Sequence, residues 1–448
     1  LVEWTKIPYS TVDSKEHRAL ALKMAQESMV LLKNNGILPL NTAKKVVVMG
    51  PNANDSVMQW GNYNGTPSRT VTLLEALQST GADVKYMRGC DYASNSMALV
   101  SLFSQCKASG QQGFDAKYWN NARGEGEPDV LRHNATPLRF STGGATVFAP
   151  NVNLEDFAAV YTSTFHADED GQVAFFMQNQ GQASISVDGR RVAMGRNGTE
   201  ARKVYTLDAK AGQDYEITIN YSCRRGEASL SFDLGYEVEV SVDKTVAECQ
   251  GVDVVIFAGG ISPSLEGEEM PVSIDGFRGG DRTKIELPTA QTELVKALKA
   301  AGLKVVFVNF SGSAMGLTEV EPACDAILQA WYPGEEGGNA IKSVLYGEYN
   351  PGGRLPVTFY RSTDQLPDFE DYSMKGRTYR YMTEKPLYPF GYGLSYSKFT
   401  YKGIKIKKSG ENYKVSLKVK NNGKMDGDEV VQVYVRRPGD TEGPSHAL

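Results

Sequence analysis

The chain has 448 residues, of which 41% are hydrophobic and 23% charged, and its formal net charge at pH 7 is −5. A chain of this length is predicted to form two to four domains. The acidic balance argues against nucleic acid as a partner. No apolar run reaches the ~18 residues of a membrane helix, so no membrane association is predicted.

The N-terminal segment predicts a long helix. The run DSKEHRALALKMAQESMVLLKNNG begins with Asp13 and Ser14, either of which can cap a helix. Leu20, Met24 and Leu31 fall on one helical face, and a glycine lies just beyond the last periodic residue. We therefore expect one helix along this run.

Strand and helix patterns then alternate. A strand, a helix and a second strand are predicted in KKVVVMGPN, TVTLLEALQSTG and ADVKYMRG. Later in the chain the alternation returns in VDVVIFAGG, PTAQTELVKALKAAG, LKVVFVNFSG, ACDAILQAWY and GGNAIKSVLYG. This alternation predicts a parallel sheet covered by helices.

The segment between these two parts has a different pattern. From about Gly113 to Gly235, short alternating runs are separated by turns, as in AAVYTSTFHADEDGQVAFFMQ, ASISVDGRRVAM, DYEITINYSC and ASLSFDLG. Period-2 alternation at this spacing predicts an all-β sandwich or barrel. One α/β domain with an inserted β domain is the simplest arrangement, because the two ends of a domain often lie close together.

The C-terminal segment is again all-β. After PFGYGLSYSKF, strands are predicted in YKGIKIKKS, ENYKVSLKVKNNG and DEVVQVYVRRP. An immunoglobulin-like sandwich has about seven strands, so we expect a truncated one here.

The predicted fold class is therefore α/β: an α/β sandwich with a parallel sheet, interrupted by an all-β domain and followed by a truncated β-sandwich. The expected boundaries are 1–110 and 239–390 for the two parts of the α/β domain, 111–238 for the insertion and 391–448 for the last domain.

The cysteines and the strand-end turns favour no metal or cofactor. Five cysteines are scattered without CxxC spacing: Cys90, Cys106, Cys223, Cys249 and Cys324. This pattern predicts neither a zinc site nor a disulfide framework. Cys90 and Cys106 could pair, but free buried thiols are expected. The turn GPNAND is not GxGxxG, and GxxxxGK is absent, so nucleotide binding is not favoured.

A cluster of carboxylates follows the buried strand VDVVIFAGG. The run SPSLEGEEMP contains Glu266, Glu268 and Glu269. Ligands bind at the carboxyl ends of strands in doubly wound sheets. Neighbouring like charges raise each other's pKa, which a general acid needs near neutral pH. The next run, MPVSIDGFRGGDR, predicts a glycine-containing loop that can move.

The same carboxylates also fit two non-catalytic structures. The first is a solvated acidic turn. The second is a calcium loop formed by Glu266, Glu268, Asp275 and Asp281, although their spacing departs from DxDxDG.

A second carboxylate pair lies in WYPGEEGGN, at a strand end that leads into a helix. We interpret Glu335, Glu336, Gly337 and Gly338 as a structural turn.

Three long stretches resemble glycoside hydrolase family 3. They are HRALALKMAQESMVLLKNNGILPL, AWYPGEEGGNAIKSVLYGEYNPGGRLPVTF and GRTYRYMTEKPLYPFGYGLSYSKF. The resemblance covers nearly the whole chain. It implies an order of domains in which a TIM barrel comes first, then an α/β sandwich domain, then a fibronectin type III-like domain.

The inserted segment resembles the β-sandwich module named after anthrax protective antigen. The matching features are FDAKYWNN, the strand around Phe165 and ISVDGRRV. The acidic DDG turn of that module is replaced by QNQGQ. Sugar or calcium binding by that turn is therefore not expected.

The family resemblance implies a retaining β-glycosidase. An aspartate on the barrel attacks the anomeric carbon, and a glutamate on the α/β domain protonates the leaving oxygen and then activates water. The two carboxyl groups stand ~5–5.5 Å apart in such enzymes. By resemblance the acid/base lies in LEGEE, with Glu268 favoured, Glu266 next and Glu269 a solvated neighbour. The family's Asp-Arg pair, Asp281 and Arg282, is displaced by the loop between.

The barrel and its nucleophile motif, Asp followed by Trp, do not occur in these residues. We therefore expect this chain to supply the acid/base and to be inactive without the N-terminal TIM barrel, which would also carry most residues that grip the sugar.

The expected substrate is an oligosaccharide with a terminal β-linked sugar. PYSTVDSKEHRALALKMAQESMVLLKN is most similar to the β-xylosidase branch, with β-glucosidase as the alternative. A non-catalytic carbohydrate-binding protein and an adhesion module are the other function classes. The resemblance implies a periplasmic or secreted protein.

Overall fold

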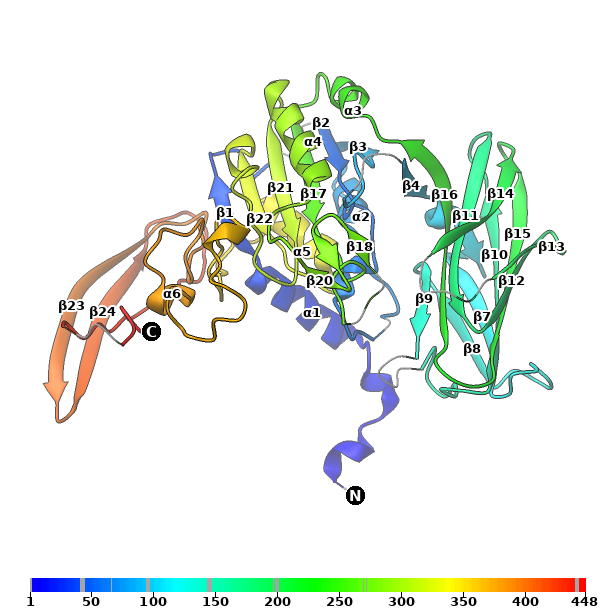
Figure 1. Cartoon of the computed structure of the whole chain (residues 1–448), viewed down its shortest axis with the longest axis horizontal. Coiled ribbons are helices and arrows are strands. Elements are labelled where there is room, and N and C mark those ends of the chain that lie inside the picture. Colours follow the sequence, from blue (N-terminus) through cyan, green and yellow to red (C-terminus); the bar gives the residue numbers. More distant parts are fainter. Residues whose placement is uncertain are drawn as a thin grey trace.

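The computed structural model describes residues 2–40, 45–65, 67–93, 97–142, 147–195, 197, 201–268, 270, 272–439 and 443–448. Figure 1 shows an α/β domain in the middle, a β-sandwich on one side and a long β-hairpin on the other. The predicted α/β class with extra β domains is confirmed. No helix in these ranges is long and apolar enough to cross a membrane.

A six-stranded sheet forms the centre of the α/β domain, in the order β1-β22-β21-β17-β2-β3. Its strands are β1 (Val30–Asn34), β2 (Lys45–Met49), β3 (Asp83–Met87), β17 (Val254–Gly260), β21 (Val305–Phe310) and β22 (Ala326–Gln329). All are parallel except the edge strand β1, which runs antiparallel to β22. The predicted parallel sheet is confirmed.

Helices cover both faces of this sheet. They are α1 (Lys15–Ser28), α2 (Leu73–Gln78), α3 (Val242–Glu248), α4 (Thr289–Ala300) and α5 (Gly337–Leu345). Alternate residues of each strand enter two separate apolar cores, one with α3 and α4 and the other with α1, α2 and α5. The sheet therefore presents its strand ends, rather than its faces, to a ligand.

The predicted N-terminal helix is too long. Helix α1 ends at Ser28, and the apolar run after it forms strand β1 instead. Leu31 is buried in that strand, whereas Leu20 and Met24 are exposed on α1. Pairing of the short apolar run with β22 outweighs its local helix pattern, a tertiary effect that periodicity does not report. Of the two predicted caps, Ser14 accepts the His17 amide at 3.3 Å.

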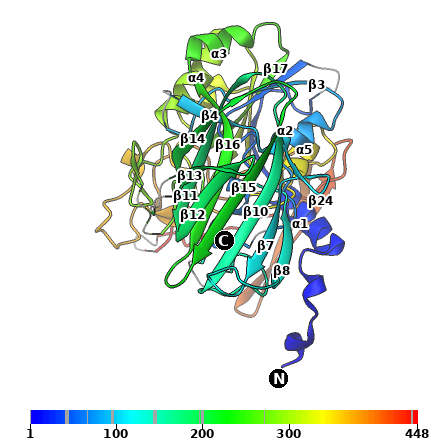
Figure 2. The ribbon, with the colours of Figure 1, turned by 90° about the vertical axis from the view of Figure 1, so that its right-hand side faces the viewer.

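The inserted segment is a β-sandwich of two antiparallel sheets, seen from its own side in Figure 2. One sheet contains β4 (Met97–Ser101), β9 (Leu138–Ser141), β11 (Gly171–Gln180), β14 (Arg202–Ala209) and β16 (Ser229–Glu239). The other contains β5 (Cys106–Ala108), β6 (Gln111–Gln112), β7 (Phe114–Trp119), β8 (Val130–Asn134), β10 (Phe157–His166), β12 (Gln182–Val187), β13 (Arg190–Met194) and β15 (Asp214–Cys223).

The sandwich core is rich in aromatic rings, including fully buried Phe114, Phe165 and Phe232. Strands β4 and β5 belong to these sheets although they precede residue 111. All five cysteines of the chain are free and buried, as the sequence predicts.

The C-terminal segment forms one hairpin of β23 (Phe399–Ser409) and β24 (Asn412–Asn421). The third strand expected from DEVVQVYVRRP does not form. Within residues 428–438 the structure has a single isolated bridge, between Val435 and Ala447.

The segment that contains DEVVQVYVRRP is held by side-chain hydrogen bonds. Glu429 accepts a hydrogen bond from Arg354 at 2.7 Å, and Gln432 donates to the Gly391 carbonyl at 2.8 Å. Glu429 also accepts from the Tyr401 hydroxyl on β23, so this segment contacts both the α/β domain and the hairpin without forming a third strand.

The described residues also contain short elements. They are α6 (Thr378–Tyr381), the strands β18 (Ser273–Ile274), β19 (Phe277–Arg278) and β20 (Asp281–Arg282), and the 3₁₀ turns η1 (Glu3–Lys6), η2 (Tyr9–Thr11), η3 (Met58–Trp60), η4 (Phe103–Gln105), η6 (Glu321–Ala323) and η7 (Thr363–Gln365).

Candidate active site

The glutamate run leaves the sheet at the point where the strand order reverses. Strand β17 lies beside β2, although β3 comes between them in the chain, and the later strands continue on the other side of β17. Open α/β sheets bind ligands in the crevice at such a switch point, outside the carboxyl ends of the strands. The glutamate run thus lies at the edge of the sheet where a ligand-binding site is expected.

Side chains fill the bottom of this crevice. Asn52, after β2, donates to the carbonyls of Gly259 and Ile261 at 3.0 and 3.3 Å, and the Tyr92 hydroxyl donates to Asn52. A Cβ atom on Gly50 would lie 2.3 Å from the Ala258 carbonyl oxygen. The GPNAND turn is thus packed onto β17 and does not form an open phosphate cradle.

Glu266 is held by segments that follow three strands of the sheet. Tyr332, after β22, donates its hydroxyl to Glu266 Oε1 at 2.6 Å, and Asn62, after β2, donates to the Glu266 carbonyl at 2.9 Å. Gly312, after β21, has no side chain and so leaves room for the Tyr332 ring and the Glu266 carboxylate. A Cβ there would lie 3.0 Å from Tyr332 Cε2 and 3.4 Å from Glu266 Oε1. The partly buried Glu266 carboxylate therefore has a fixed orientation.

Two ionisable groups face Glu266. Burial raises the pKa of Tyr332 and the charge of Glu266 raises it further, so the phenol stays protonated and donates. Burial lowers the pKa of Arg282, and Glu266 opposes that shift. Arg282 donates to Ser313 Oγ at 3.0 Å and to the Ala314 carbonyl at 2.9 Å. Its guanidinium is thus anchored beside the glutamate run.

Glu268 has different surroundings. Its side chain is exposed, and its only described partner is the hydroxyl of Tyr63, which donates to Oε2. Tyr63 is itself 81% exposed and adopts a left-handed backbone conformation, with φ 54°. Two carboxylates two residues apart are thus divided into an inward, fixed group and an outward, accessible one. Glu269 lies outside the described residues.

The described part of the loop after the glutamates, residues 272–282, contains paired strands. It folds into the small sheet β18-β19-β20, and Phe277 at its centre is buried against the α/β core. The Gly267 amide donates to the Gly280 carbonyl at 3.1 Å. A Cβ on Gly280 would lie 1.9 Å from the Gly267 carbonyl oxygen. Pairing and one buried ring therefore hold residues 272–282 in this conformation, and the mobility expected from the sequence stays a prediction.

The carboxylates considered for a calcium loop do not gather. Asp275 forms an ion pair with Lys284 at 3.0 Å, and Glu266 is bound to Tyr332. Within the described ranges, no group of three or more His, Cys, Asp or Glu side chains is placed to hold a metal ion.

Sequence patterns alone do not identify Asn62, Tyr63, Gly312 or Tyr332. Each lies shortly after a strand of the sheet, so the strand order β22-β21-β17-β2 is the signal that finds them. In the sequence, Arg282 is noticeable only as part of the Asp281-Arg282 pair, which a loop separates from the glutamates. The structure brings its side chain back to the glutamates through the short sheet.

A family model and several known proteins match this chain. A model of the glycosyl hydrolase family 3 C-terminal domain matches residues 29–396. A xylan 1,4-β-xylosidase from Xylanibacter ruminicola is 45% identical over 456 residues, covering 100% of this chain and 53% of that protein. A periplasmic β-glucosidase from Salmonella typhimurium is 36% identical over 215 residues, covering 44% of this chain and 27% of that protein.

The fold has a solved counterpart. The crystal structure of a β-glucosidase from Kluyveromyces marxianus superposes with a TM-score of 0.76 at 25% identity, covering 99% of this chain and 56% of that one. The chain spans about half the length of the curated relatives it matches.

Proposed function

The chain belongs to glycoside hydrolase family 3, as its C-terminal part, and we propose that it supplies the general acid/base of a retaining β-glycosidase. The observation that carries this proposal is the division of two neighbouring carboxylates at the switch-point edge into a fixed Glu266 and an accessible Glu268. A general acid must present an oxygen to the substrate within hydrogen-bond reach.

Glu268 meets that requirement better than Glu266. Its carboxylate is exposed, and its partner Tyr63 is an exposed side chain that an incoming sugar can displace. The Oε1 atom of Glu266 already accepts from Tyr332, so Glu266 fits a fixed anion beside the acid. We therefore assign the acid/base role to Glu268 and a positioning role to Glu266.

The reaction needs a second carboxylate that approaches the sugar from the other side. In a retaining mechanism the nucleophile stands ~5–5.5 Å from the acid/base. We propose that an aspartate of an N-terminal barrel attacks the anomeric carbon while Glu268 gives its proton to the leaving oxygen. Glu268 then removes a proton from water as that water displaces the aspartate, which restores both carboxyl groups.

The proposed substrate is an oligosaccharide with a terminal β-xylosyl residue. Support comes from the relative named as a xylan 1,4-β-xylosidase, which aligns along the whole chain. β-Glucosides are the alternative, because two of the compared proteins are β-glucosidases. A periplasmic or secreted location is proposed from the relative named as periplasmic.

The test uses the full-length protein that includes the barrel. In Glu268→Gln, turnover of xylobiose and of aryl xylosides with basic leaving groups should fall ~10²–10⁴-fold, the usual worth of general acid help. Turnover of a dinitrophenyl xyloside should fall far less in its glycosylation step, because that leaving group needs no proton. Glu27→Gln, an exposed glutamate on α1, is the matched control.

Glu266→Gln separates the two assignments. It should reduce turnover of both substrate types by similar factors. Equal losses on both substrates in Glu268→Gln, together with leaving-group dependence in Glu266→Gln, would move the acid/base role to Glu266.

A further inference from the structure

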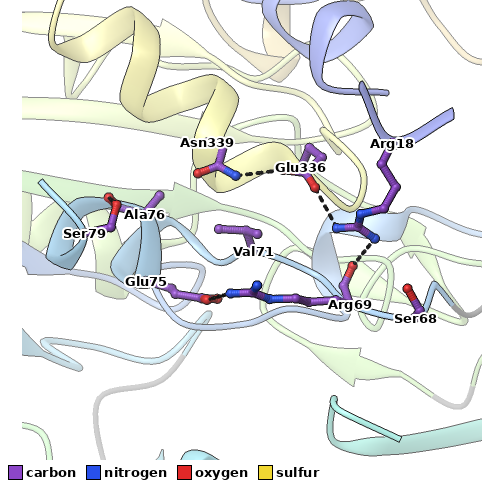
Figure 3. A pocket seen from close by; sticks show the side chains of 9 residues that line it. All are labelled: Arg18, Ser68, Arg69, Val71, Glu75, Ala76, Ser79, Glu336 and Asn339. Atoms are coloured by element: carbon purple, nitrogen blue, oxygen red, sulfur yellow. Dashed lines mark hydrogen bonds and ion pairs between the residues drawn. The ribbon is translucent and has the colours of Figure 1, made fainter. Parts of the chain in front are cut away.

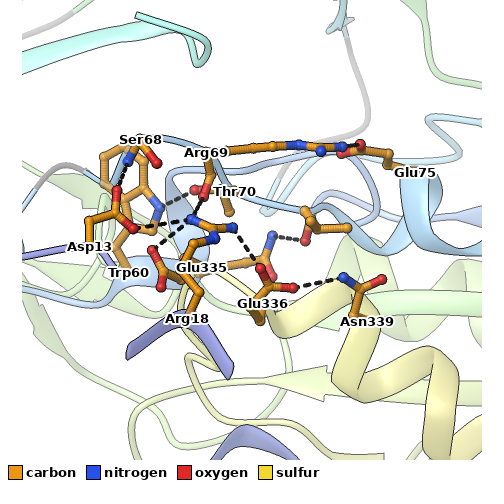
Figure 4. Close-up of polar contacts among 12 residues, drawn as sticks. Asp13, Arg18, Trp60, Ser68, Arg69, Thr70, Glu75, Glu335, Glu336 and Asn339 are labelled. Atoms are coloured by element: carbon orange, nitrogen blue, oxygen red, sulfur yellow. Dashed lines mark hydrogen bonds and ion pairs between the residues drawn. The ribbon is translucent and has the colours of Figure 1, made fainter. Parts of the chain in front are cut away.

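A charged network joins the start of α1 to two distant turns, as Figure 4 shows. Arg18, in the first turn of α1, lies at its centre. Its Nη1 atom is 3.1 Å from Glu335 Oε2 and its Nη2 atom is 2.6 Å from Glu336 Oε1. Nη1 also donates to the Arg69 carbonyl at 3.0 Å and to Asp13 Oδ1 at 3.3 Å. One guanidinium therefore connects three segments of the chain.

The network is largely shielded from solvent. The charged side chains of Arg18, Asp13, Glu335 and Glu336 are between 12% and 20% exposed. Burial raises the pKa of Glu335, and Arg18 opposes that shift. Three carboxylates depend on this one cation, so its removal would leave them close together and shielded, which is costly.

The first segment that Arg18 holds carries Asn62 and Tyr63. The C-terminal end of this segment is fixed by two hydrogen bonds. Arg18 donates to the Arg69 carbonyl, and the Ser68 amide donates to Asp13 Oδ2 at 2.7 Å. The two ends of the segment are joined by a hydrogen bond from Trp60 Nε1 to Thr70 Oγ1 at 2.7 Å. The loop that contacts both Glu266 and Glu268 is thus anchored at the network.

The second segment carries Tyr332, the phenol that holds Glu266. It runs through a tight turn into Glu335 and Glu336, and the Gly334 amide donates to the Gln59 carbonyl at 2.8 Å. A Cβ on Gly338 would lie 2.1 Å from the Thr72 carbonyl oxygen, so helix α5 starts in direct contact with the start of α2. The turn therefore has little freedom between Tyr332 and the network.

A cavity of about 380 Å³ lies beside the network. Figure 3 shows the side chains that line it. Its charged lining groups and Asn339 already bond to one another: Arg69 to Glu75, Asn339 to Glu336 and Arg18 to Glu336. This pairing favours a structural connection over a ligand site.

We propose that Arg18 is a positioning residue for the glutamate pair, because it fixes at once the two segments that hold Glu266 and Glu268. The proposal rests on the proposed acid/base function. Its consequence is that loss of Arg18 misplaces the acid while the rest of the sheet and its cores remain intact.

The test compares leaving groups in the full-length protein. In Arg18→Met, kcat for xylosides with basic leaving groups should fall ~10²-fold with KM changed less than about threefold, because misplacing a catalytic group by ~1 Å has such an effect. The glycosylation rate on a dinitrophenyl xyloside should fall by a smaller factor, no larger than that of Glu266→Gln, because its leaving group needs no proton from Glu268. Arg18→Lys should recover part of the lost rate. Lys23→Met, which breaks an exposed ion pair on the same helix, should leave both rates unchanged.

A merely structural role would give a different result. Equal losses on both substrates in Arg18→Met would overturn the proposal, because a smaller folded fraction lowers both rates together. If Arg18→Met does not fold, Glu336→Gln weakens the same connection and must show the same selectivity. If Glu268→Gln shows leaving-group dependence but the Arg18 and Glu336 variants do not, this inference fails while the proposed function stands. If Glu268→Gln shows none, the proposed function fails.

Discussion

Replacing Tyr332 by phenylalanine isolates the bond that fixes Glu266. The change removes one oxygen and keeps the ring, which packs beside Gly61 and Gly312. The lost interaction is a 2.6 Å hydrogen bond to a partly buried carboxylate. Hydrogen bonds to charged groups contribute about 1.5–3 kcal/mol. At about 1.4 kcal/mol per factor of ten, local opening of the glutamate loop should become ~10–150-fold more frequent.

Amide hydrogen exchange measures this opening directly, since it reports local stability within a multidomain protein. The informative amides are those of Leu265, Glu266 and Gly267, which donate to the Ser262 and Gly280 carbonyls. In Tyr332→Phe, peptides that cover these residues should exchange faster by that factor. Peptides from the sandwich should exchange as before.

Tyr388→Phe is the matched control. Tyr388 is buried in the same domain, and its hydroxyl has no hydrogen-bond partner among the described residues. Its removal should be neutral or slightly stabilising. Unchanged exchange around Glu266 in Tyr332→Phe, or an equal change in Tyr388→Phe, would refute the role assigned to the Tyr332 hydroxyl.

Two further predictions concern stability. Gly338→Ala should destabilise the α/β domain by ~1–3 kcal/mol, because the new Cβ would meet the Thr72 backbone oxygen at 2.1 Å. This steric cost should exceed the gain from alanine's higher helix propensity. A urea titration that shows stabilisation would contradict this prediction. Burial raises the pKa of Asp233 from its ordinary value of 3.8 to about 7. The folded protein therefore holds a proton that the unfolded chain releases, so the contribution of Asp233 to stability should fall as pH rises from ~4 to ~7. Asp233→Asn should flatten that slope in thermal melts, and an unchanged slope would contradict the assignment.

The layer structure of the protein could be predicted from sequence because it follows from local patterns. Continuous apolar runs marked the buried parallel strands, and period-2 alternation marked the sandwich. The predictions were wrong where contacts with a distant segment of the chain determined the local structure. The run after Ser28 formed a strand because β22 offered an edge. The run DEVVQVYVRRP formed none, and its residues Glu429 and Gln432 make side-chain hydrogen bonds instead.

The candidate site was predictable to a similar extent. Glu266 and Glu268 stood out because they form a carboxylate cluster at a strand end, but their different surroundings depend on Tyr332 and Tyr63, which are distant in sequence. Arg18 gave no signal, because its partners Glu335 and Glu336 lie more than 300 positions away, in the turn interpreted as structural. Such connections become visible only when the strand order is known.

The proposed mechanism places the acid/base in this chain and the nucleophile in another part of the full-length protein. Its most direct test is to treat that protein with a 2-deoxy-2-fluoro-β-xylosyl fluoride, whose glycosyl-enzyme intermediate accumulates when the second step is slow. Peptide mass spectrometry then locates the labelled carboxylate. The label should lie on an aspartate outside these 448 residues. A label on a residue within them, including Glu266 or Glu268, would contradict this division of roles.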